Sequence, residues 1–288
     1  MSVSIEVKNL SHTYSVGTPF EHEAIHALNF TVQPGEFLGI IGHTGSGKST
    51  LIQHLNGLLK PTQGDVLLGG QSIWRDKKAT REARFRVGLV FQYPEYQLFE
   101  ETVYKDIAFG PKNMGLDADE VRARVHRAAG FVGVPEALLE VSPFDLSGGQ
   151  KRRVAIAGVI AMEPEIVIFD EPTAGLDPAG CADILENICA YRRANNATII
   201  MVSHSMDDVA KLADRLLVLR DGAIALSGAP GEVFAQAKCL REIGLEVPQV
   251  TQLLLELQSL GVPVDTAAYT TQQALAQLLS LKEGAANA

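Results

Sequence analysis

A glycine-rich segment, which lies between a short apolar run and a helical pattern, limits this chain to few folds. Its residues, in order, are Gly42, His43, Thr44, Gly45, Ser46, Gly47, Lys48, Ser49 and Thr50. They fit the pattern G-x-x-x-x-G-K-[ST], in which backbone N–H groups surround a phosphate and a helix N-terminus adds its dipole. In such a loop the lysine, Lys48, reaches the β- and γ-phosphates, and the hydroxyl of Ser49 binds Mg²⁺. The segment therefore predicts a nucleotide site.

The remainder of the chain alternates between apolar runs and helical patterns. Short buried strands are predicted at residues 37–41, 87–91, 166–169, 198–202 and 216–219. Amphipathic helices are predicted at residues 48–59, 179–193 and 206–213. This alternation indicates an α/β fold whose core is a mostly parallel sheet. The glycine-rich segment then follows a strand and opens a helix, which is the context that its motif needs.

Three other parts of the sequence differ in pattern. Residues 4–7 and 29–32 predict antiparallel strands near the N-terminus. Residues from about 93 to 162 hold helical patterns and, from residue 104 on, no strand pattern, which predicts an inserted helical subdomain. Amphipathic patterns at 250–260 and from residue 270 predict a small helical extension. We therefore expect a nucleotide-binding domain at 1–235 and an extension at 236–288.

Two carboxylates follow one of the predicted buried strands. Residues 166–169 are all apolar, and Asp170 and Glu171 come directly after them. In α/β sheets, ligands bind outside the carboxyl ends of the strands, so both acids are placed where a nucleotide would bind. Asp170 suits the oxygen shell of Mg²⁺, and Glu171 is free to polarise an attacking water as general base.

A second phosphate-binding surface is predicted where the helical pattern of residues 150–162 begins. The preceding residues are Leu146, Ser147, Gly148, Gly149 and Gln150. A serine and two glycines at a helix N-terminus expose backbone N–H groups that bind anions. The same pattern is common as a simple helix cap, so the complete string LSGGQ is needed to make the signal specific.

Taken in order, these motifs resemble those of the ATP-binding subunit of an ABC (ATP-binding cassette) transporter, over residues 1 to about 235. The resemblance implies a P-loop NTPase fold with an antiparallel β subdomain and a helical subdomain. It also implies ATP and Mg²⁺ as cofactors, and ATP hydrolysis that is coupled to transport across a membrane. In the family two cassettes pair head to tail, so that Ser147, Gly148, Gly149 and Gln150 of one cap the ATP held by the other.

The resemblance also assigns roles to single residues. Gln92 corresponds to a glutamine that joins the magnesium shell and senses the transmembrane partner. Asp177 corresponds to an aspartate that communicates between the two cassettes. His204 corresponds to the switch histidine that contacts the γ-phosphate. Tyr14 occupies the position of an aromatic that stacks on adenine, although the spacer of residues 15–23 is longer than usual.

A narrower resemblance points to the energy-coupling-factor (ECF) branch, whose members import vitamins and transition-metal ions. It is carried by FQYPEYQLF at 91–99, DIAFGP at 106–111, GTPFEHEA at 17–24 and LSGGQKRRVAIAG at 146–158. The last two strings, with the C-terminal extension, are most similar to the second of the two paralogous ECF ATPases. The implied partners are a second ATPase subunit, a transmembrane coupling subunit and an integral substrate-binding subunit. The pairing with a paralogue is favoured over a homodimer, and the implied location is the cytoplasmic face of the cell membrane.

Two other functions fit part of this pattern. One is the ATPase of another ABC importer, which the FQYPEYQLF string and the C-terminal extension argue against. The other is a soluble ABC-type ATPase that acts on nucleic acid or ribosomes. With 25 basic and 34 acidic side chains, the chain has a net charge of −9 and no electrostatic footprint for nucleic acid. We therefore expect no nucleic-acid partner. The transported substrate is not encoded here, because ECF specificity lies in a separate membrane subunit.

Two surface features leave alternatives open. Residues 75–86 carry six basic and two acidic side chains, which indicates either a solvated helical face or a contact with anionic lipid headgroups. The apolar stripe at 250–260 either packs on its own domain or forms a contact between cassettes.

No stretch has the ~20 consecutive apolar residues that a membrane-spanning helix needs.

Overall fold

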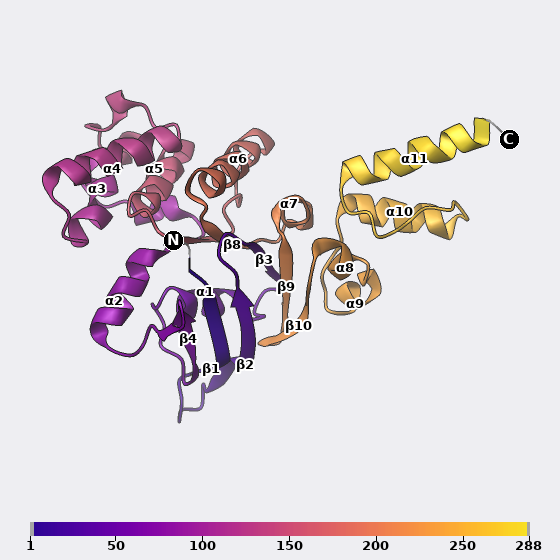
Figure 1. The fold of residues 1–288 in the computed structure, drawn as a ribbon, viewed down its shortest axis with the longest axis horizontal. Coiled ribbons are helices and arrows are strands. Elements are labelled where there is room, and N and C mark those ends of the chain that lie inside the picture. Colours follow the sequence, from indigo (N-terminus) through magenta and orange to yellow (C-terminus); the bar gives the residue numbers. More distant parts are fainter. Residues whose placement is uncertain (1–2, 287–288) are drawn as a thin grey trace. The chain divides into compact units, whose positions relative to one another are not determined.

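The structure is a computed structural model that describes residues 3–286, with side chains described as far as residue 282. The chain divides into two compact units. Figure 1 labels the α-helices and most of the strands. The first unit comprises the residues up to 36 together with 49–202, and the second comprises 37–48 together with the residues from 203 onward. Each unit has its own strands and helices.

The N-terminal strands of the first unit form an antiparallel sheet in the order β2-β1-β4-β5. The strands are β1 (Ile5–Tyr14), β2 (His22–Val32), β4 (Gln63–Leu68) and β5 (Gln71–Ser72). Irregularities in the β1–β2 pairing let it continue from Ile5, opposite Val32, to Tyr14, opposite His22. The antiparallel strands are thus confirmed, but they are longer than predicted.

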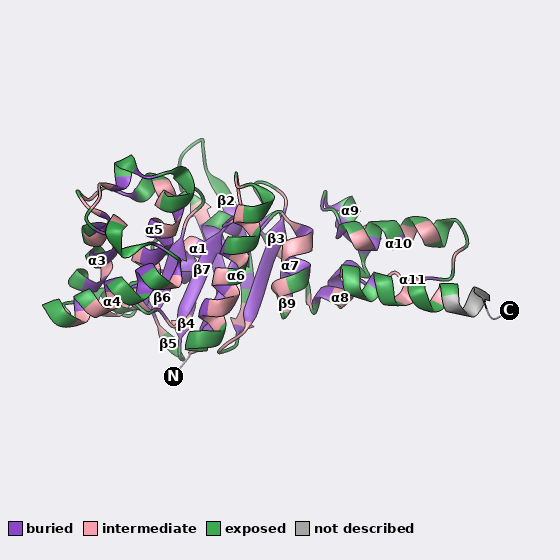
Figure 2. Cartoon of the chain, turned by 90° about the horizontal axis from the view of Figure 1, so that it is seen from above, coloured by how far each residue is buried: buried purple, intermediate pink, exposed green. Residues whose placement is uncertain are grey.

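Three parallel strands make the core of the first unit: β6 (Val87–Val90), β7 (Ile166–Asp170) and β8 (Thr198–Val202). β7 pairs with β6 on one side and with β8 on the other. Every residue of the three strands is buried. Figure 2 labels β6 and β7 and draws buried residues in purple. Such uniform burial explains why these strands are continuous apolar runs in the sequence.

Four further helices of the first unit connect the strands. They are α1 (Lys48–Leu55, which enters the first unit at Ser49), α2 (Lys77–Arg86), the 3₁₀ helix η1 (Pro94–Gln97) and α6 (Pro178–Asn195). The helix predicted at 48–59 ends early, because Gly57 adopts a φ of +74° and Leu58 N–H donates to Gln53 O. The basic pattern at 75–86 is a helix that Asp76 caps by accepting from Ala79 N–H.

The helical insertion of the first unit is formed by α3 (Val103–Asn113), α4 (Ala118–Phe131) and α5 (Gly148–Ile160), which lie side by side (Figure 1). Short 3₁₀ turns, η2 (Glu136–Leu138) and η3 (Pro143–Asp145), connect α4 to α5. α3 was not predicted, and it contains Pro111 near its C-terminal end. As predicted, the structure has no strand between residues 104 and 162.

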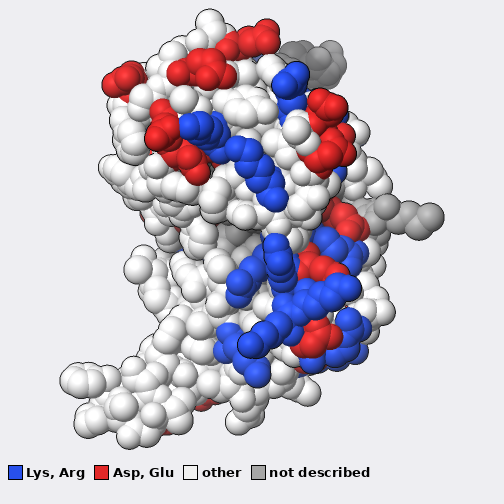
Figure 3. Space-filling view, turned by 90° about the vertical axis from the view of Figure 1, so that its left-hand side faces the viewer, with Lys and Arg blue, Asp and Glu red and all other residues white. Residues whose placement is uncertain are grey.

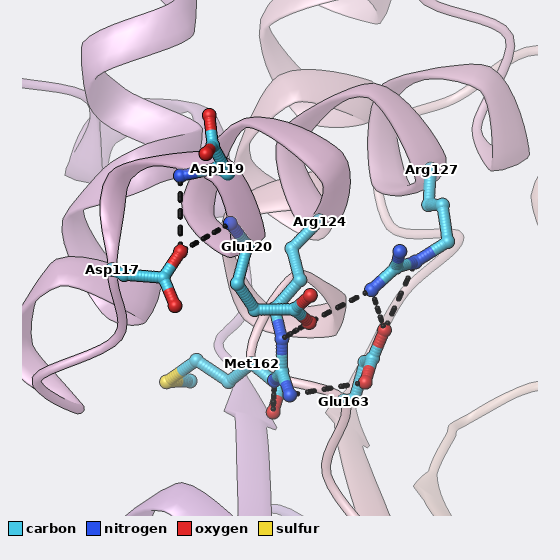
Figure 4. A network of polar contacts seen from close by, with 7 residues as sticks. All are labelled: Asp117, Asp119, Glu120, Arg124, Arg127, Met162 and Glu163. Atoms are coloured by element: carbon cyan, nitrogen blue, oxygen red, sulfur yellow. Dashed lines mark hydrogen bonds and ion pairs between the residues drawn. The ribbon is translucent and has the colours of Figure 1, made fainter.

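A network of ion pairs joins this insertion to the turn that precedes β7 (Figure 4). Arg124 of α4 donates to Glu120 Oε1 at 2.8 Å and to Met162 O at 2.9 Å, and it pairs with Glu163. Arg127 pairs with the same two carboxylates, Glu120 and Glu163. Because Glu163 lies only three residues before β7, the network links α4 to the strand that ends in Asp170.

The second unit contains β3 (Phe37–Gly42), β9 (Arg215–Arg220), β10 (Ala223–Gly228) and α7 (Met206–Leu212). β3 pairs with β9 in parallel, and β10 pairs with β9 in antiparallel orientation. The start of β3 is held by reciprocal bonds, in which Phe37 N–H donates to Asp214 Oδ2 and Asp214 N–H donates to Phe37 O. β10 was not predicted, because its alternating pattern of small residues is a weak strand signal.

The C-terminal part of the second unit is helical, as expected: α8 (Pro230–Phe234), α9 (Ala237–Glu242), α10 (Gln249–Ser259) and α11 (Thr271–Ala286). A cluster centred on Leu254 and Val264 packs α10 against α11, and Val250 and Leu257 join it. The apolar stripe at 250–260 therefore packs partly on its own unit. Leu260 is exposed, so a contact between cassettes stays a prediction for that side. No helix within residues 3–286 is both long and apolar enough to cross a membrane.

Candidate nucleotide-binding site

The glycine-rich segment forms a tight loop between β3 and α1. Ser46 N–H donates to His43 O at 3.1 Å, and Gly45 and Gly47 adopt φ values of +82° and +99°. A Cβ at Gly42 would lie 2.5 Å from Ser46 Oγ, so only glycine fits there. The loop therefore has the curled backbone in which successive N–H groups form an anion-binding concavity.

Lys48 holds this loop from within. Its Nζ donates to Gly42 O at 2.6 Å and to His43 O at 2.9 Å, and only 7% of the residue is exposed. A buried ammonium group that is fixed against the loop is already placed for phosphate oxygens. The neighbouring His43 ring contacts Thr44 O at 2.8 Å and pairs with Asp221 at 3.4 Å, which ties the loop to the β9–β10 turn.

His204 follows β8 and belongs to the same unit as Lys48. Burial and the Lys48 ammonium both lower the pKa of His204 below its ordinary value, so its ring is neutral at pH 7. A neutral imidazole both donates and accepts a hydrogen bond. His204 lines a pocket of about 620 Å³ together with His43 and Thr44 of the loop and with residues 244–247, Gln249 and Gln252 of the C-terminal segment.

The two predicted acids lie at the carboxyl end of β7 in the first unit. Asp170 and Glu171 are 9% and 8% exposed, respectively. Glu171 adopts a φ of +51°, which is uncommon for a residue with a side chain, and its N–H donates to Val202 O at 2.9 Å. The strained backbone turns the chain sharply at the strand end, as is frequent at functional sites.

Oxygen donors of the kind that bind Mg²⁺ come from three places in the first unit. Ser49 is in the first turn of α1, Asp170 ends β7, and Gln92 lies two residues beyond β6. β6 and β7 are parallel neighbours with Val90 opposite Phe169, so Gln92 and Asp170 leave the sheet at the same edge. The described residues contain no cluster of three or more His, Cys, Asp or Glu side chains that would hold a metal by themselves. This donor set fits Mg²⁺, which is usually held by one or two carboxylates together with phosphates.

The LSGGQ string forms the start of α5. Ser147 caps the helix, because Gln150 N–H donates to Ser147 Oγ at 3.4 Å and Ser147 N–H donates to Gln150 Oε1 at 2.9 Å. This reciprocal pair is a capping box, which the spacing S-x-x-Q would itself have predicted. Gly148 and Gly149 are exposed, and a Cβ at either would meet no atom within 4 Å. The first turn of α5 thus presents an open surface.

Asp177 caps the N-terminus of α6, as Ser147 caps that of α5. Its Oδ1 accepts from Gly180 N–H at 2.7 Å, and Pro178 occupies the first helical position. The residue is exposed. Its carboxylate is therefore held by its own helix while it remains accessible to another molecule.

Tyr14 ends β1 and is 38% exposed. Its hydroxyl lies 3.2 Å from Oγ1 of Thr50, the last residue of the glycine-rich segment. On one side its ring packs edge-on against His12, which in turn packs edge-on against His54 of α1. Neither histidine was identified from the sequence as part of the site. Their spacing is nevertheless informative: His12 and Tyr14, two apart on a strand, lie on one face of it, and Thr50 and His54, four apart on a helix, lie on one face of that helix. Tyr14 is therefore fixed next to α1 and keeps an accessible surface.

Acid should destabilise the protein through this histidine pair. His54 is fully buried, and burial lowers its pKa to about 4, well below its ordinary value of 6.5. Because the unfolded chain then binds the proton more readily than the folded chain, stability is lost as the pH falls from 6.5 towards 4, by about 3 kcal/mol for this group. Urea unfolding of the protein and of a His54→Leu variant at pH 7, 6, 5 and 4.5 measures this contribution. We expect the variant to have the shallower pH dependence, and an unchanged slope would exclude it. The exposed His26, replaced by leucine, serves as the control.

The basic residues of α2 are largely engaged within the protein. Arg84 donates to Gly57 O, Arg81 donates to Asn113 O, and Arg86 pairs with Glu165. Figure 3 shows Lys and Arg side chains gathered on the side of the molecule where α2 lies, with acidic side chains among them. These contacts favour a solvated helical face over a surface dedicated to lipid headgroups.

A groove of about 310 Å³ lies beside the residues that follow Gln92, and it is lined mainly by apolar side chains such as Leu98, Phe109 and Met162. Phe99 and Phe109 pack edge to face at 4.9 Å between ring centroids, and both remain exposed. The backbone of Phe99 and Glu100 is fixed by Asp106, whose Oδ2 accepts from both N–H groups. Burial raises the pKa of Asp106. The groove is thus a formed apolar surface with a rigid edge.

Comparison with known proteins gives the following matches. A family model described as "ABC transporter" matches residues 25–174. The energy-coupling factor transporter ATP-binding protein EcfA2 of Caldanaerobacter subterraneus subsp. tengcongensis is 52% identical over 283 residues, which are 98% of this chain and 99% of that protein. The protein of the same name from Clostridium perfringens is 53% identical over 97% of this chain and 98% of its own length.

Two solved structures have a similar fold. One is described as cbiO1 from Clostridium perfringens, part of the ABC transporter complex cbiONQ. It has a TM-score of 0.74 and 39% identity, and the match covers 91% of this chain and 99% of that chain. The other is the ATP-binding cassette MJ0796, a dimer in a post-hydrolysis state bound to ADP and Pi. It has a TM-score of 0.71 and 27% identity, and the match covers 78% of this chain and 98% of that chain.

Proposed function

This chain belongs to the ATP-binding proteins of energy-coupling-factor transporters, within the ABC transporter family, and from that premise we propose how its residues bind and hydrolyse ATP. It is the ATP-hydrolysing subunit of an ECF-type importer. The main support for the proposed site is the loop of residues 42–48, which already has a phosphate-binding shape. In it the Lys48 ammonium is hydrogen-bonded to the carbonyls of Gly42 and His43.

The triphosphate binds in the loop of residues 42–50. Backbone N–H groups of the loop and Lys48 neutralise the β- and γ-phosphates, and this charge stabilisation is the main catalytic contribution in phosphoryl transfer. Glu171 orients and polarises the attacking water as general base. His204, neutral at pH 7, hydrogen-bonds the γ-phosphate and supports the same transition state. Tyr14 stacks on the adenine with its accessible ring face.

Mg²⁺ is bound by Ser49, Asp170 and Gln92 together with phosphate oxygens. All three side chains offer oxygen ligands, which Mg²⁺ prefers. When bound, the ion neutralises charge that develops on the β- and γ-phosphates. The protein's part is to place Asp170, which would hold the ion, at the end of the buried strand β7, directly before Glu171.

The complete site needs two cassettes. The exposed first turn of α5, with Ser147, Gly148, Gly149 and Gln150, binds the γ-phosphate of the ATP held by the partner cassette. Asp177, exposed at the start of α6, contacts the partner and reports whether its site is filled. That two cassettes pair is supported by the similar cassette MJ0796, which was solved as a dimer bound to ADP and Pi. The head-to-tail arrangement is what the family resemblance implies. The partner is a paralogous ATPase or a second copy of this chain.

The membrane partners follow from the family. A transmembrane coupling subunit docks at residues 92–101 and the adjoining apolar groove, and an integral subunit binds the transported vitamin or metal ion. The chain therefore acts as a peripheral protein at the cytoplasmic face of the cell membrane. Residues 1–235 form the ABC domain, with the helical subdomain at about 93–162, and residues 236–288 form the C-terminal extension.

Phosphate release from ATP tests this proposal. We expect turnover by the assembled ATPase pair in the presence of Mg²⁺, and no turnover when EDTA removes the ion. ATP should still protect the loop of residues 42–50 from proteolysis when Glu171 is replaced by glutamine. Turnover that is independent of Mg²⁺ would contradict the proposed site.

A further inference from the structure

Arg152 is a buried cation that the proposed chemistry does not use. It lies on α5, five residues after Ser147, and is 3% exposed. Its guanidinium makes a two-pronged contact with Glu95, from Nε to Oε2 at 3.1 Å and from Nη2 to Oε1 at 3.0 Å. Its remaining nitrogen, Nη1, donates to Ala174 O at 2.9 Å and to Pro172 O at 3.4 Å. One side chain thus satisfies acceptors from two separate loops.

These contacts join segments that have different tasks. Glu95 belongs to η1, three residues after Gln92, in the segment proposed to meet the transmembrane subunit. Pro172 directly follows Glu171, and Ala174 lies three residues before Asp177. Arg152 therefore connects the proposed docking region at residues 92–101, the helix α5 that begins with the LSGGQ string, and the main chain next to the general base.

Tyr93 packs the same two loops together. Its ring centroid lies 6.0 Å from Arg152 Cζ, which is within cation–π range. Its Cε1 would be 3.5 Å from a Cβ at Gly175, so the ring rests on the chain just beyond Ala174. Tyr93 itself adopts a φ of +53°, an uncommon conformation that the surrounding contacts must maintain.

A buried ion pair is a costly way to fill this space. Desolvation of both charges offsets most of their attraction, and apolar side chains of similar size often serve stability equally well. What the guanidinium adds is geometry, because its planar fork fixes a carboxylate and two carbonyl oxygens in a single arrangement. Stability alone therefore does not explain why a buried Arg152–Glu95 ion pair is present here. The positioning of the loop carbonyls that Arg152 binds does explain it.

We propose that Arg152 is a positioning residue for hydrolysis: clamped by Glu95, it holds the Pro172 and Ala174 carbonyls and thereby sets the place of the Glu171 carboxylate. This inference rests on the proposed role of Glu171. The backbone of Glu171 is strained and its N–H is bonded to Val202 O, so this residue is held in one uncommon conformation. Because Pro172 is bonded directly to Glu171, a shift of the Pro172 carbonyl also displaces the general base, and a misplacement of about 1 Å lowers turnover by about a hundredfold.

A double-mutant cycle on the assembled ATPase complex tests the clamp. Arg152→Lys keeps the charge but lacks the fork, and Glu95→Gln keeps the shape but lacks the charge. We expect each substitution to lower kcat for ATP by about tenfold, with KM for ATP changed less than about twofold. The double variant should be no slower than the slower single variant, because both remove one interaction. Arg153→Lys is the matched control, since this neighbouring arginine makes an exposed pair with Asp183 and should leave kcat unchanged.

Melting temperatures and hydrogen exchange separate positioning from a loss of folding. In Glu95→Gln, the amides of residues 173–175 should exchange faster, while those of β7 keep their protection. Additive losses in the double variant would overturn the proposal, and so would a raised KM with normal kcat or an unchanged kcat in both single variants. Glu171→Gln is measured alongside. If that variant turns over ATP normally, the proposed function fails; if it is inactive while Arg152→Lys is normal, the positioning inference alone fails.

Discussion

A Glu171→Gln variant is expected to bind ATP as tightly as the unchanged protein and to hydrolyse it at least about a hundredfold more slowly. General-base catalysis contributes roughly a hundred- to ten-thousandfold, and an amide cannot take up the proton of the attacking water. The substitution keeps the size of the side chain, so the buried end of β7 is preserved. Phosphate release at saturating ATP and binding of a labelled nucleotide measure the two effects separately.

The control for this variant lies at the other end of the same strand. Glu165 immediately precedes β7 and pairs with Arg86 at 2.5 Å. It therefore lies at the opposite end of the strand from Glu171. Glu165→Gln should therefore leave turnover unchanged. Normal turnover by Glu171→Gln would exclude its role as general base. Loss of both turnover and nucleotide binding would instead assign Glu171 to binding.

A Gly149→Asp variant is expected to fold normally, to bind ATP through its own loop of residues 42–50, and to lose about a hundredfold in turnover. No atom lies within 4 Å of a Cβ at Gly149, so the fold accommodates the side chain. An acidic group in the first turn of α5 even interacts favourably with the helix dipole. In the composite site, however, its negative charge would face the γ-phosphate held by the partner cassette and remove the charge stabilisation that hydrolysis requires.

Gly130 provides the matched control for this substitution. It lies in α4 of the same insertion, is exposed, and a Cβ there also meets no atom within 4 Å. Gly130→Asp adds the same charge away from the proposed site and should leave turnover within about twofold. Equal activity of the two variants would contradict the composite site. Impaired ATP binding by the Gly149→Asp chain itself would place α5 next to its own nucleotide.

The strands and the motifs were predictable because their signals are local. Residues 166–170 are buried on every side, and such strands are continuous apolar runs that pattern alone detects. The loop of residues 42–50 carries its glycines at positions where the backbone needs them. Ser147 at the start of α5 was likewise foreseeable from its spacing to Gln150.

What the sequence did not reveal depends on contacts between distant residues. α3 was missed because Gly110 and Pro111 disfavour a helix locally. Yet a Cβ at Gly110 would lie 2.6 Å from Met162 Cγ, so the glycine allows α3 to pack closely against the Met162 side chain just beyond α5. The Arg152–Glu95 ion pair joins residues that are 57 positions apart, and no local sequence pattern predicts it.

The most direct test of the account is to purify the tagged, full-length chain from detergent-solubilised membranes and to identify the proteins that accompany it in stoichiometric amounts. We predict a second ATPase, a transmembrane coupling subunit and a small integral substrate-binding protein, which are the partners of an ECF importer. Co-purification with ribosomes or nucleic acid, and with no integral membrane protein, would contradict the assignment to transport.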